Sequence, residues 1–196
     1  ATHGQVQFEG VWGSLSGTIH LDRVTYTSKS QSSQIVLKKA KISLKLADLL
    51  KEKVTITELR AQNLEFLTLK YTGKPLVLPK SMALPIDLQV VDAQIEHIAY
   101  HELNNKHIYN FKKVHAQFIS TPTLWNITLY DSHSDFGDIK AKATMLPITP
   151  FTLQGKAQLN GKIEQNPYAW QAQVTGPLLD FTAQGKAHFA EVTADL

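Results

Sequence analysis

Hydrophobic and polar residues alternate strictly in two nearly identical segments towards the C-terminal end of the chain. FTLQGKAQL begins at Phe151, FTAQGKAHF begins at Phe181, and six of the nine positions are identical. Alternation with a period of two is typical of a β-strand that has one buried face. The chain between the copies alternates in the same way around Trp170, with turn residues at 164–167 and 175–178. The pattern therefore predicts an antiparallel meander that repeats after 30 residues.

One face of this meander is apolar, and the alternating segments at 125–129 and 138–145 extend it upstream. Gly155 and Gly185 lie on that face, where small residues either leave room for a bound chain or only ease the curvature of the sheet. We expect the larger apolar residues to form one continuous floor that binds lipid. These residues are Phe151, Leu153, Ala157, Leu159, Trp170, Val174, Phe181, Ala187 and Phe189.

A second repeated unit occupies the first 120 residues. It consists of two alternating apolar residues, a central polar pair and two more alternating apolar residues, as in IHLDRVTY. The polar pair shifts the alternation by one residue, so each pair predicts a bulge or bend within a continuing strand. The first and fourth copies are 74 residues apart, as are the second and fifth, which indicates a larger unit used twice. The copies lie at 19–26, 35–42, 59–66, 93–100 and 109–116.

Only one helix is predicted, near Ala47–Lys51, where Leu46, Leu49 and Leu50 have helical spacing and would pack on the sheet. The predicted fold class is therefore mainly all-β, an elongated and curled antiparallel sheet with one short helix. Because a single helix cannot cover an apolar sheet face, the sheet must close on itself or curl around something else. Residues 1–120 would form the repeat of bent strands and 121–196 the continuing meander, as two parts or as one continuous domain.

Composition excludes several kinds of site. The 196 residues include no cysteine, which excludes disulfides, thiolate metal ligands and cysteine nucleophiles and is compatible with an oxidising compartment. The net charge of +3 is small and the lysines are spread along polar strand faces, so no nucleic-acid binding is expected. No apolar run reaches the ~18 residues of a membrane-spanning helix. The opening ATHGQ is no signal sequence, so an excised segment or a mature product is expected.

The polar residues show no catalytic motif. Asp131, His133 and Asp135 in DSHSD could ligate a metal ion, but Asp and Ser are also typical of a polar turn, and we predict no tight metal binding. No phosphate-binding glycine loop or serine-hydrolase motif occurs. Three tryptophans could line a ligand site, although large aromatic residues on apolar strand faces usually belong to the core. They are Trp12, Trp125 and Trp170. The sequence predicts a protein that is not an enzyme and needs no cofactor.

The order of these motifs resembles one known family. GQVQFEGVWGSLSGTIHLDRVTY is similar to the segment that follows the membrane anchor in the TamB family of translocation and assembly proteins, which are related to AsmA-like and bridge-like lipid-transfer proteins. KISLKLADLLKEKVTITELRAQNLEF resembles the next part of that family, a strand, a short leucine-rich helical turn and another strand. LPIDLQVVDAQIEHIAYH and LWNITLYDSHSDFGDIKAKATM follow in the same order, so the resemblance covers nearly the whole chain.

The resemblance implies a long β-sheet folded lengthwise into a taco with an apolar groove inside. It further implies a place in the periplasm of a Gram-negative bacterium, as part of a protein anchored in the inner membrane. The partners it implies are phospholipid acyl chains and, through the full-length protein, a TamA-like outer-membrane barrel. The implied roles are phospholipid transport between the two membranes and support of outer-membrane protein assembly. The sequence lacks the anchor and the partner-binding domain of that family, so we expect one segment of the bridge.

Two alternatives remain open from the sequence. A chaperone-like scaffold could offer its sheet edge to nascent outer-membrane strands by β-augmentation, which relies on backbone hydrogen bonds and tolerates many sequences. A closed transmembrane or lipocalin-like barrel is the other, although bent strands and a helix do not suit a transmembrane barrel.

Overall fold

The computed structural model describes residues 4–29, 31–69, 80–101, 108–189 and 192–195. Apart from one short 3-10 helix, η1 (Leu46–Lys51), the regular elements of these residues are twelve strands of a single sheet. The strands are β1 (Gln5–Gly13), β2 (Thr18–Thr27), β3 (Ser33–Leu44), β4 (Lys53–Thr68), β5 (Asp87–His101), β6 (Ile108–Ser120), β7 (Trp125–Ser134), β8 (Gly137–Met145), β9 (Thr152–Ile163), β10 (Asn166–Pro177), β11 (Thr182–Phe189) and β12 (Val192–Asp195).

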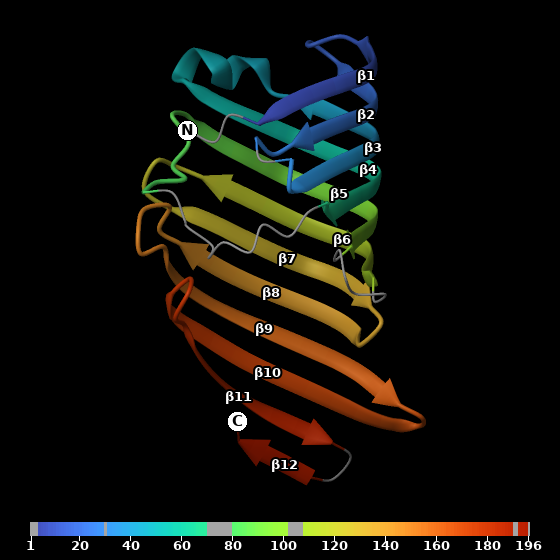
Figure 1. Cartoon of the computed structure of the whole chain (residues 1–196), viewed down its shortest axis with the longest axis vertical. Helices are drawn as coiled ribbons and strands as arrows, with labels where there is room; N and C mark the ends of the chain where they lie inside the picture. The colour runs from blue at the N-terminus through green and yellow to red at the C-terminus, as the bar shows by residue number, and fades with distance from the viewer. Residues whose placement is uncertain (1–3, 30, 70–79, 102–107, 190–191, 196) are drawn as a thin grey trace.

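The strands follow one another in the sheet in chain order, from β1 at one edge to β12 at the other (Figure 1). Neighbouring strands are antiparallel except β4 and β5, which are parallel. A parallel neighbour requires the chain to return along the sheet between the end of β4 at Thr68 and the start of β5 at Asp87. The 74-residue offset in the sequence relates β2 to β5 and β3 to β6, on opposite sides of this parallel junction.

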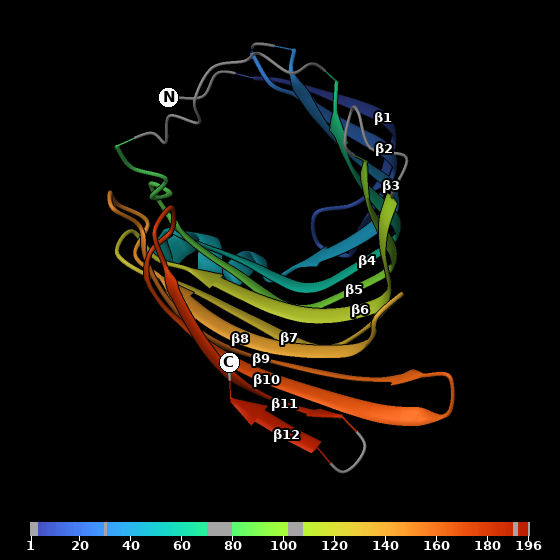
Figure 2. The ribbon, with the colours of Figure 1, turned by 60° about the horizontal axis from the view of Figure 1, so that its bottom comes forward.

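The sheet is curled along its length but is not closed into a barrel, because β1 and β12 lie at opposite ends of it (Figure 2). Each described strand packs only against its neighbours in the sheet, and η1 packs on β4. The curled all-β fold with one short helix is confirmed, and the closed-barrel alternative is wrong. Since no second layer covers the sheet among the described residues, its curvature is what gives the apolar face its burial.

The five polar pairs of the N-terminal repeat mark the places where β2–β6 bend. Leu21 pairs with Ala40 and Arg23 with Lys38, so one residue on each strand is left out of the pairing while the register is kept. The predicted irregularity is therefore present, as a matched bend in adjacent strands rather than an extra residue in one strand. The residues left out are Asp22, Lys39, Gln62, Glu96 and Lys113.

The backbone conformation at these bends depends on the direction in which the strand runs. Gly10, Lys39 and Lys113 have φ of 59°, 49° and 51°, and they belong to β1, β3 and β6, which run in the same direction. A left-handed residue costs little at glycine and more at lysine. At Gly10 a Cβ atom would come within 1.9 Å of the Asp22 carboxylate, so a larger residue there would force the Asp22 side chain to move.

Beside the polar pairs lies a row of buried apolar residues, one from each of five strands. Their register is continuous and each is at most 9% exposed. Apolar residues from the far side of the bend pack against this row, among them Val24, Leu64 and Phe111. Side chains from both sides of a bend can meet only on its concave side, so the bends curl the sheet towards its apolar face. We call this the bend row, and it consists of Leu21, Ala40, Ala61, Ile95 and Val114.

The helix forms where it was predicted, but two of its three leucines do not pack on the sheet as expected, while Leu46 is half-buried. Leu49 is 50% exposed and Leu50 is 91% exposed, while Asp48 is buried. A 3-10 helix has three residues per turn rather than 3.6, so the side chains that face the sheet differ from those expected for an α-helix. No helix among the described residues combines the length and apolar character needed to span a membrane.

Asp48 attaches η1 to β4 through its carboxylate. The Thr55 hydroxyl donates a hydrogen bond to Asp48 Oδ2 at 2.7 Å, and Lys45 Nζ lies 3.3 Å from Oδ1. The Thr55 hydrogen bond holds the pKa of Asp48 below its ordinary value, with burial acting against it and Lys45 reinforcing it. A carboxyl with a lowered folded-state pKa stabilises the fold above its unfolded pKa and loses that contribution as the pH falls.

Asp48→Asn should therefore lower the melting temperature at neutral pH, because the amide cannot reproduce the charge-assisted hydrogen bonds. The difference from the wild type should shrink as the pH falls below about 4, where the carboxyl itself becomes protonated. Thermal unfolding across this pH range measures the effect, with Asp87→Asn as a matched control. A difference that stays constant with pH would contradict the role given to the Asp48 charge.

Candidate functional site

Strand register brings most of the predicted floor residues onto one face of β9–β11. Ala157 pairs with Ala172, and Leu159 pairs with Trp170, which in turn pairs with Ala187. Directly paired residues project to the same side of a sheet, so the face is continuous across the three strands. We call this set the apolar floor, and it consists of Leu153, Ala157, Leu159, Trp170, Ala172, Val174, Ala187 and Phe189.

Two of the predicted floor residues lie just outside the strands. Phe151 precedes β9, has a left-handed φ of 58° and is completely buried. Phe181 precedes β11 and is 51% exposed. The two copies of the repeated motif thus form equivalent strands, but their first residues have different surroundings.

The apolar floor is partly accessible rather than sealed. Its residues are mostly half-buried, with Ala172 at 4% exposed, while the intervening polar residues on the other face are exposed. A Cβ atom added at Gly155 would lie 3.2 Å from both Ala143 Cβ and Val174 Cγ2. Cβ atoms directly opposite one another on neighbouring strands are usually about 4.5–5.5 Å apart, so the strands leave little space for a side chain at Gly155.

The surroundings of Gly185 show whether a small residue on the apolar face leaves room for a ligand or eases the curvature of the sheet. A Cβ atom there would lie 2.5 Å from the backbone oxygen of Gln171. The strand backbones therefore approach too closely for any side chain at this position. Glycine at 185 serves the close packing and curvature of the sheet, which favours the curvature interpretation over added room for a ligand.

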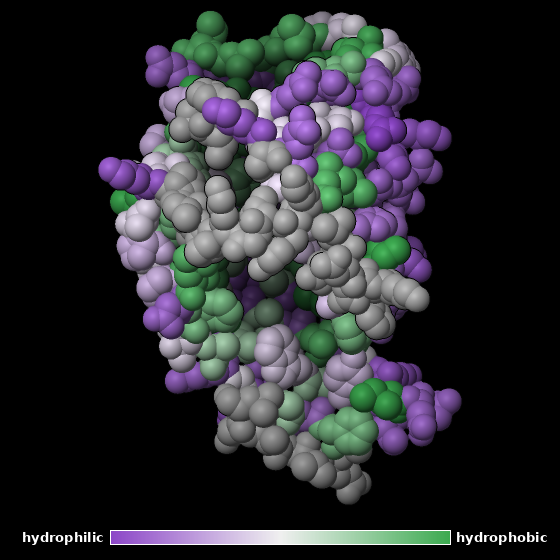
Figure 3. Space-filling view, viewed as in Figure 1, coloured by the Kyte–Doolittle hydropathy of each residue, from purple (hydrophilic) through white to green (hydrophobic). Residues whose placement is uncertain are grey.

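A row of large side chains borders the concave face on the far side of the bends. The register places one on each of β2–β6, and the rings of Tyr100 and Tyr109 are 6.2 Å apart at 40% and 42% exposure. Figure 3 shows hydrophobic residues gathered around a hollow in this view, with hydrophilic residues along its right-hand border. Sequence reasoning missed this row, although each member ends or begins a copy of the bent repeat. The row is Tyr26, Ile35, Phe66, Tyr100 and Tyr109.

Three buried polar atoms interrupt the concave face on β6 and β7. Ser120 Oγ, Trp125 Nε1 and Ser132 Oγ have no hydrogen-bond partner among the described residues. Ser120 and Trp125 are directly paired, and the Trp125 ring meets Phe118 edge-on with centroids 5.7 Å apart. Buried donors of this kind normally hold a water molecule or another polar group.

The residues considered for metal binding and for an aromatic box are not brought together. His133 Nδ1 pairs with Asp138 Oδ1 at 2.7 Å, and no group of three potential metal ligands forms among the described residues. The tryptophans lie on β1, β7 and β10. Trp12 is 59% exposed and stacks on His20 with ring centroids 3.8 Å apart, so the expectation of a core residue is wrong there.

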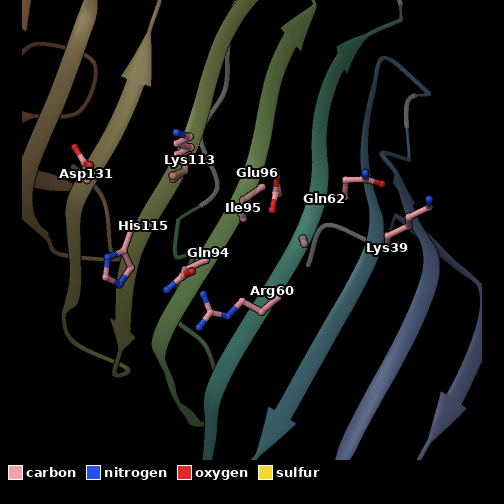
Figure 4. A pocket seen from close by; sticks show the side chains of 11 residues that line it. Lys39, Arg60, Gln62, Gln94, Ile95, Glu96, Lys113, His115 and Asp131 are labelled. Atoms are coloured by element: carbon pink, nitrogen blue, oxygen red, sulfur yellow. The ribbon is translucent and has the colours of Figure 1, made fainter.

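A pocket of about 750 Å³ lies among polar side chains of the bent strands (Figure 4). Arg60 is one of its lining residues, and its guanidinium donates to Glu58 at 2.8 Å and to Asp92 at 3.2 Å. The hydrogen bond from Arg60 holds the pKa of Glu58 below its ordinary value. His115 Nε2 also lies 3.0 Å from Asp92.

This network crosses a second irregularity, at which β4 and β5 each carry one extra residue relative to their antiparallel neighbours. Its charges bridge the parallel strands β4 and β5 and extend to β6. Of the residues that line the pocket, Arg60 and His115 form ion pairs, and their partners Glu58 and Asp92 lie beside the lining. These ion pairs connect β4 to β5 and β5 to β6 across the irregularity.

Comparison with known proteins identifies no relative. No family model, curated protein or solved structure matches the chain. The function must therefore be argued from the arrangement of the apolar floor, the bend row and the sheet edges.

Proposed function

We propose that the chain is a segment of a TamB-like bridge that carries phospholipids between the inner and outer membranes across the periplasm. The observation that carries the proposal is the apolar floor: a concave, half-buried sheet face with no second layer over it among the described residues. An apolar sheet face without a protein layer needs another apolar occupant. Acyl chains fit this requirement, since each methylene transferred from water to an apolar surface contributes about 0.8 kcal/mol.

The polar and apolar groups suit an amphiphile lying along the sheet. Acyl chains would contact Leu153, Leu159 and Val174, while the outward face, rich in Gln and Lys, stays in water. Tyrosines such as Tyr100 and Tyr109 combine an apolar ring with a polar hydroxyl and would contact the boundary between chain and headgroup. The role is not enzymatic. A TamA-like barrel and an inner-membrane anchor would connect through the full-length protein, and support of outer-membrane protein assembly would follow from that connection.

Photo-crosslinking from Leu153 tests the proposal. A photo-reactive residue at 153 should capture phospholipid in cells, and native mass spectrometry of the purified chain should detect bound phospholipid. Ala157→Asp places a carboxylate on the floor, where an unpaired charge is strongly disfavoured against an acyl chain. We expect the lipid crosslink to fall at least about tenfold in this variant, because several kcal/mol of burial cost corresponds to more than that factor.

Gln158→Asp is the matched control, since it adds the same charge one residue along β9 but on the exposed face. It should keep the crosslink. Both variants should remain folded by circular dichroism. Absence of any lipid crosslink in the unsubstituted chain, or loss of folding in Ala157→Asp, would show that the floor is only core.

A scaffold that assembles outer-membrane strands is the second candidate, and the edge strand β1 favours it. All nine residues of β1 are exposed, and its free edge offers backbone groups for β-augmentation. Binding of an unfolded barrel-strand peptide, abolished by Gln7→Pro in β1, would support this function. Lipid-free protein that binds such peptides would favour the scaffold over the conduit.

A further inference from the structure

Two lysines face each other directly on the polar side of the sheet. Lys142 on β8 pairs with Lys156 on β9, and both side chains are exposed. Like charges directly opposite on neighbouring strands destabilise a sheet. Neither lysine has an ion pair within the part of the chain that the structure describes. The pair is therefore an unfavourable arrangement of the protein alone, and an anion placed between the two ammonium groups would remove the repulsion.

The pair belongs to a pocket of about 450 Å³ on that face. Its polar lining comes from four adjacent strands and contains amides and hydroxyls but no carboxylate. These amides and hydroxyls make no hydrogen bonds with other described residues, so their donors are free. The uncharged polar lining residues are Thr144, Gln154, Gln173, Thr175, Thr182 and Gln184.

The residues beside the two lysines are uncharged, so the only charges in the pocket are positive. Along the same row, the register places Thr128 beside Lys142 and Gln173 beside Lys156, with Gln184 next. Two cations surrounded by neutral hydrogen-bond donors select an oxyanion, because ammonium groups and amide N–H groups all donate to its oxygens. A cationic ligand would find no carboxylate in this pocket with which to form an ion pair.

We infer that this pocket, named here the lysine-pair pocket, binds a phosphate group through Lys142 and Lys156 with hydrogen bonds from the neighbouring amides and hydroxyls. The two lysines alternate along β8 and β9 with Ala143 and Gly155, which line the pocket together with Val174, so the lysines lie on the face opposite the side chains of the apolar floor and the site does not depend on the proposed conduit. Its ligand is a phosphate monoester, a phosphodiester headgroup or free phosphate, which share the oxyanion that the two lysines recognise.

Calorimetric titration with inorganic phosphate at low ionic strength tests the site. Lys156→Gln and Lys142→Gln should each weaken phosphate binding about tenfold, since each removes one charge-assisted hydrogen bond. Lys140→Gln is the matched control, because it removes the same charge from the same face of β8, opposite the neutral Gln158 and outside the pocket. It should leave the affinity nearly unchanged.

Thermal unfolding provides an independent readout. Without phosphate, Lys156→Gln should raise the melting temperature because it relieves the repulsion, and added phosphate should stabilise the wild type more than this variant. No phosphate binding by the wild type, equal loss in Lys140→Gln, or a lowered melting temperature in phosphate-free Lys156→Gln would overturn the inference.

Vesicles then distinguish the sources of the phosphate group. Co-sedimentation with phosphatidylglycerol vesicles that Lys156→Gln abolishes and phosphate reverses would support a lipid headgroup as the ligand. Phosphate binding without such co-sedimentation would support a soluble phosphate compound.

Discussion

Ile95→Ala should lower the free energy of unfolding by about 2–4 kcal/mol, the range for removing a large aliphatic side chain from a packed core. Ile95 is 9% exposed and lies in the bend row directly between Ala61 and Val114. These neighbours are short or branched at Cβ and cannot extend into the space that Ile95 leaves. The apolar residues across the bend, including Ile98, would then lose contacts on the concave side.

Chemical denaturation measures this effect, and Ile127→Ala is its control. Ile127 lies on the same face of the sheet in β7 but is 43% exposed, so its truncation should cost about 1 kcal/mol or less. Equal losses in the two variants would contradict the view that the bends concentrate the burial of this single-layer sheet. A strongly reduced denaturant dependence in Ile95→Ala would indicate that the curl itself is lost.

Phe151→Ala should cost about 3–5 kcal/mol, the usual range for a buried phenylalanine, whereas Phe181→Ala should cost less than about 1 kcal/mol. The two residues begin the two copies of the same motif, so each is the other's control. Phe151 is completely buried, and Phe181 is half exposed. The comparison requires only thermal or denaturant unfolding of the two single variants.

The difference between these phenylalanines comes from the chain beside Phe151. Met82 donates a backbone hydrogen bond to Pro147, and Thr149 donates one to Lys80, so the segment before β5 runs along the turn before β9. The turn before β11 has a single backbone hydrogen bond of this kind among the described residues, from Leu178 to Pro150 at 3.4 Å, and Pro150 belongs to the turn before β9 rather than to a covering segment. Similar losses in both variants would show that this covering segment contributes nothing to the burial of Phe151.

Much of the sheet could be predicted from local pattern. Strict alternation identified the faces of β9–β11, because the side-chain period of a strand depends on backbone geometry alone. The polar pairs located the bends of β2–β6 for the same reason: two consecutive outward side chains require a change in the backbone. The row of large side chains from Tyr26 to Tyr109 was also present in the pattern, because each member begins or ends a copy of the bent repeat. The alignment of these side chains across five strands, however, depends on register.

Other features were not predictable from local sequence. The helical spacing of Leu46, Leu49 and Leu50 predicted that η1 would bury its leucines. Instead, the residue of η1 that is buried is Asp48, because the Thr55 hydroxyl on β4 donates a hydrogen bond to its carboxylate. Nearly identical motifs gave a buried Phe151 and a half-exposed Phe181, because burial depends on segments distant in sequence. The parallel pairing of β4 and β5 likewise depends on a long crossover rather than on either strand.

By itself, the sequence determined that this protein is a β-sheet with one apolar face, bent at five polar pairs, since strand periodicity and phase are local properties of the chain. Only the tertiary structure decided that the sheet stays open, that its bends face the apolar side, and that Lys142 meets Lys156. These outcomes depend on which strands pair and in which register. Register is set by hydrogen bonds and packing between residues far apart in the chain, and no single strand contains that information.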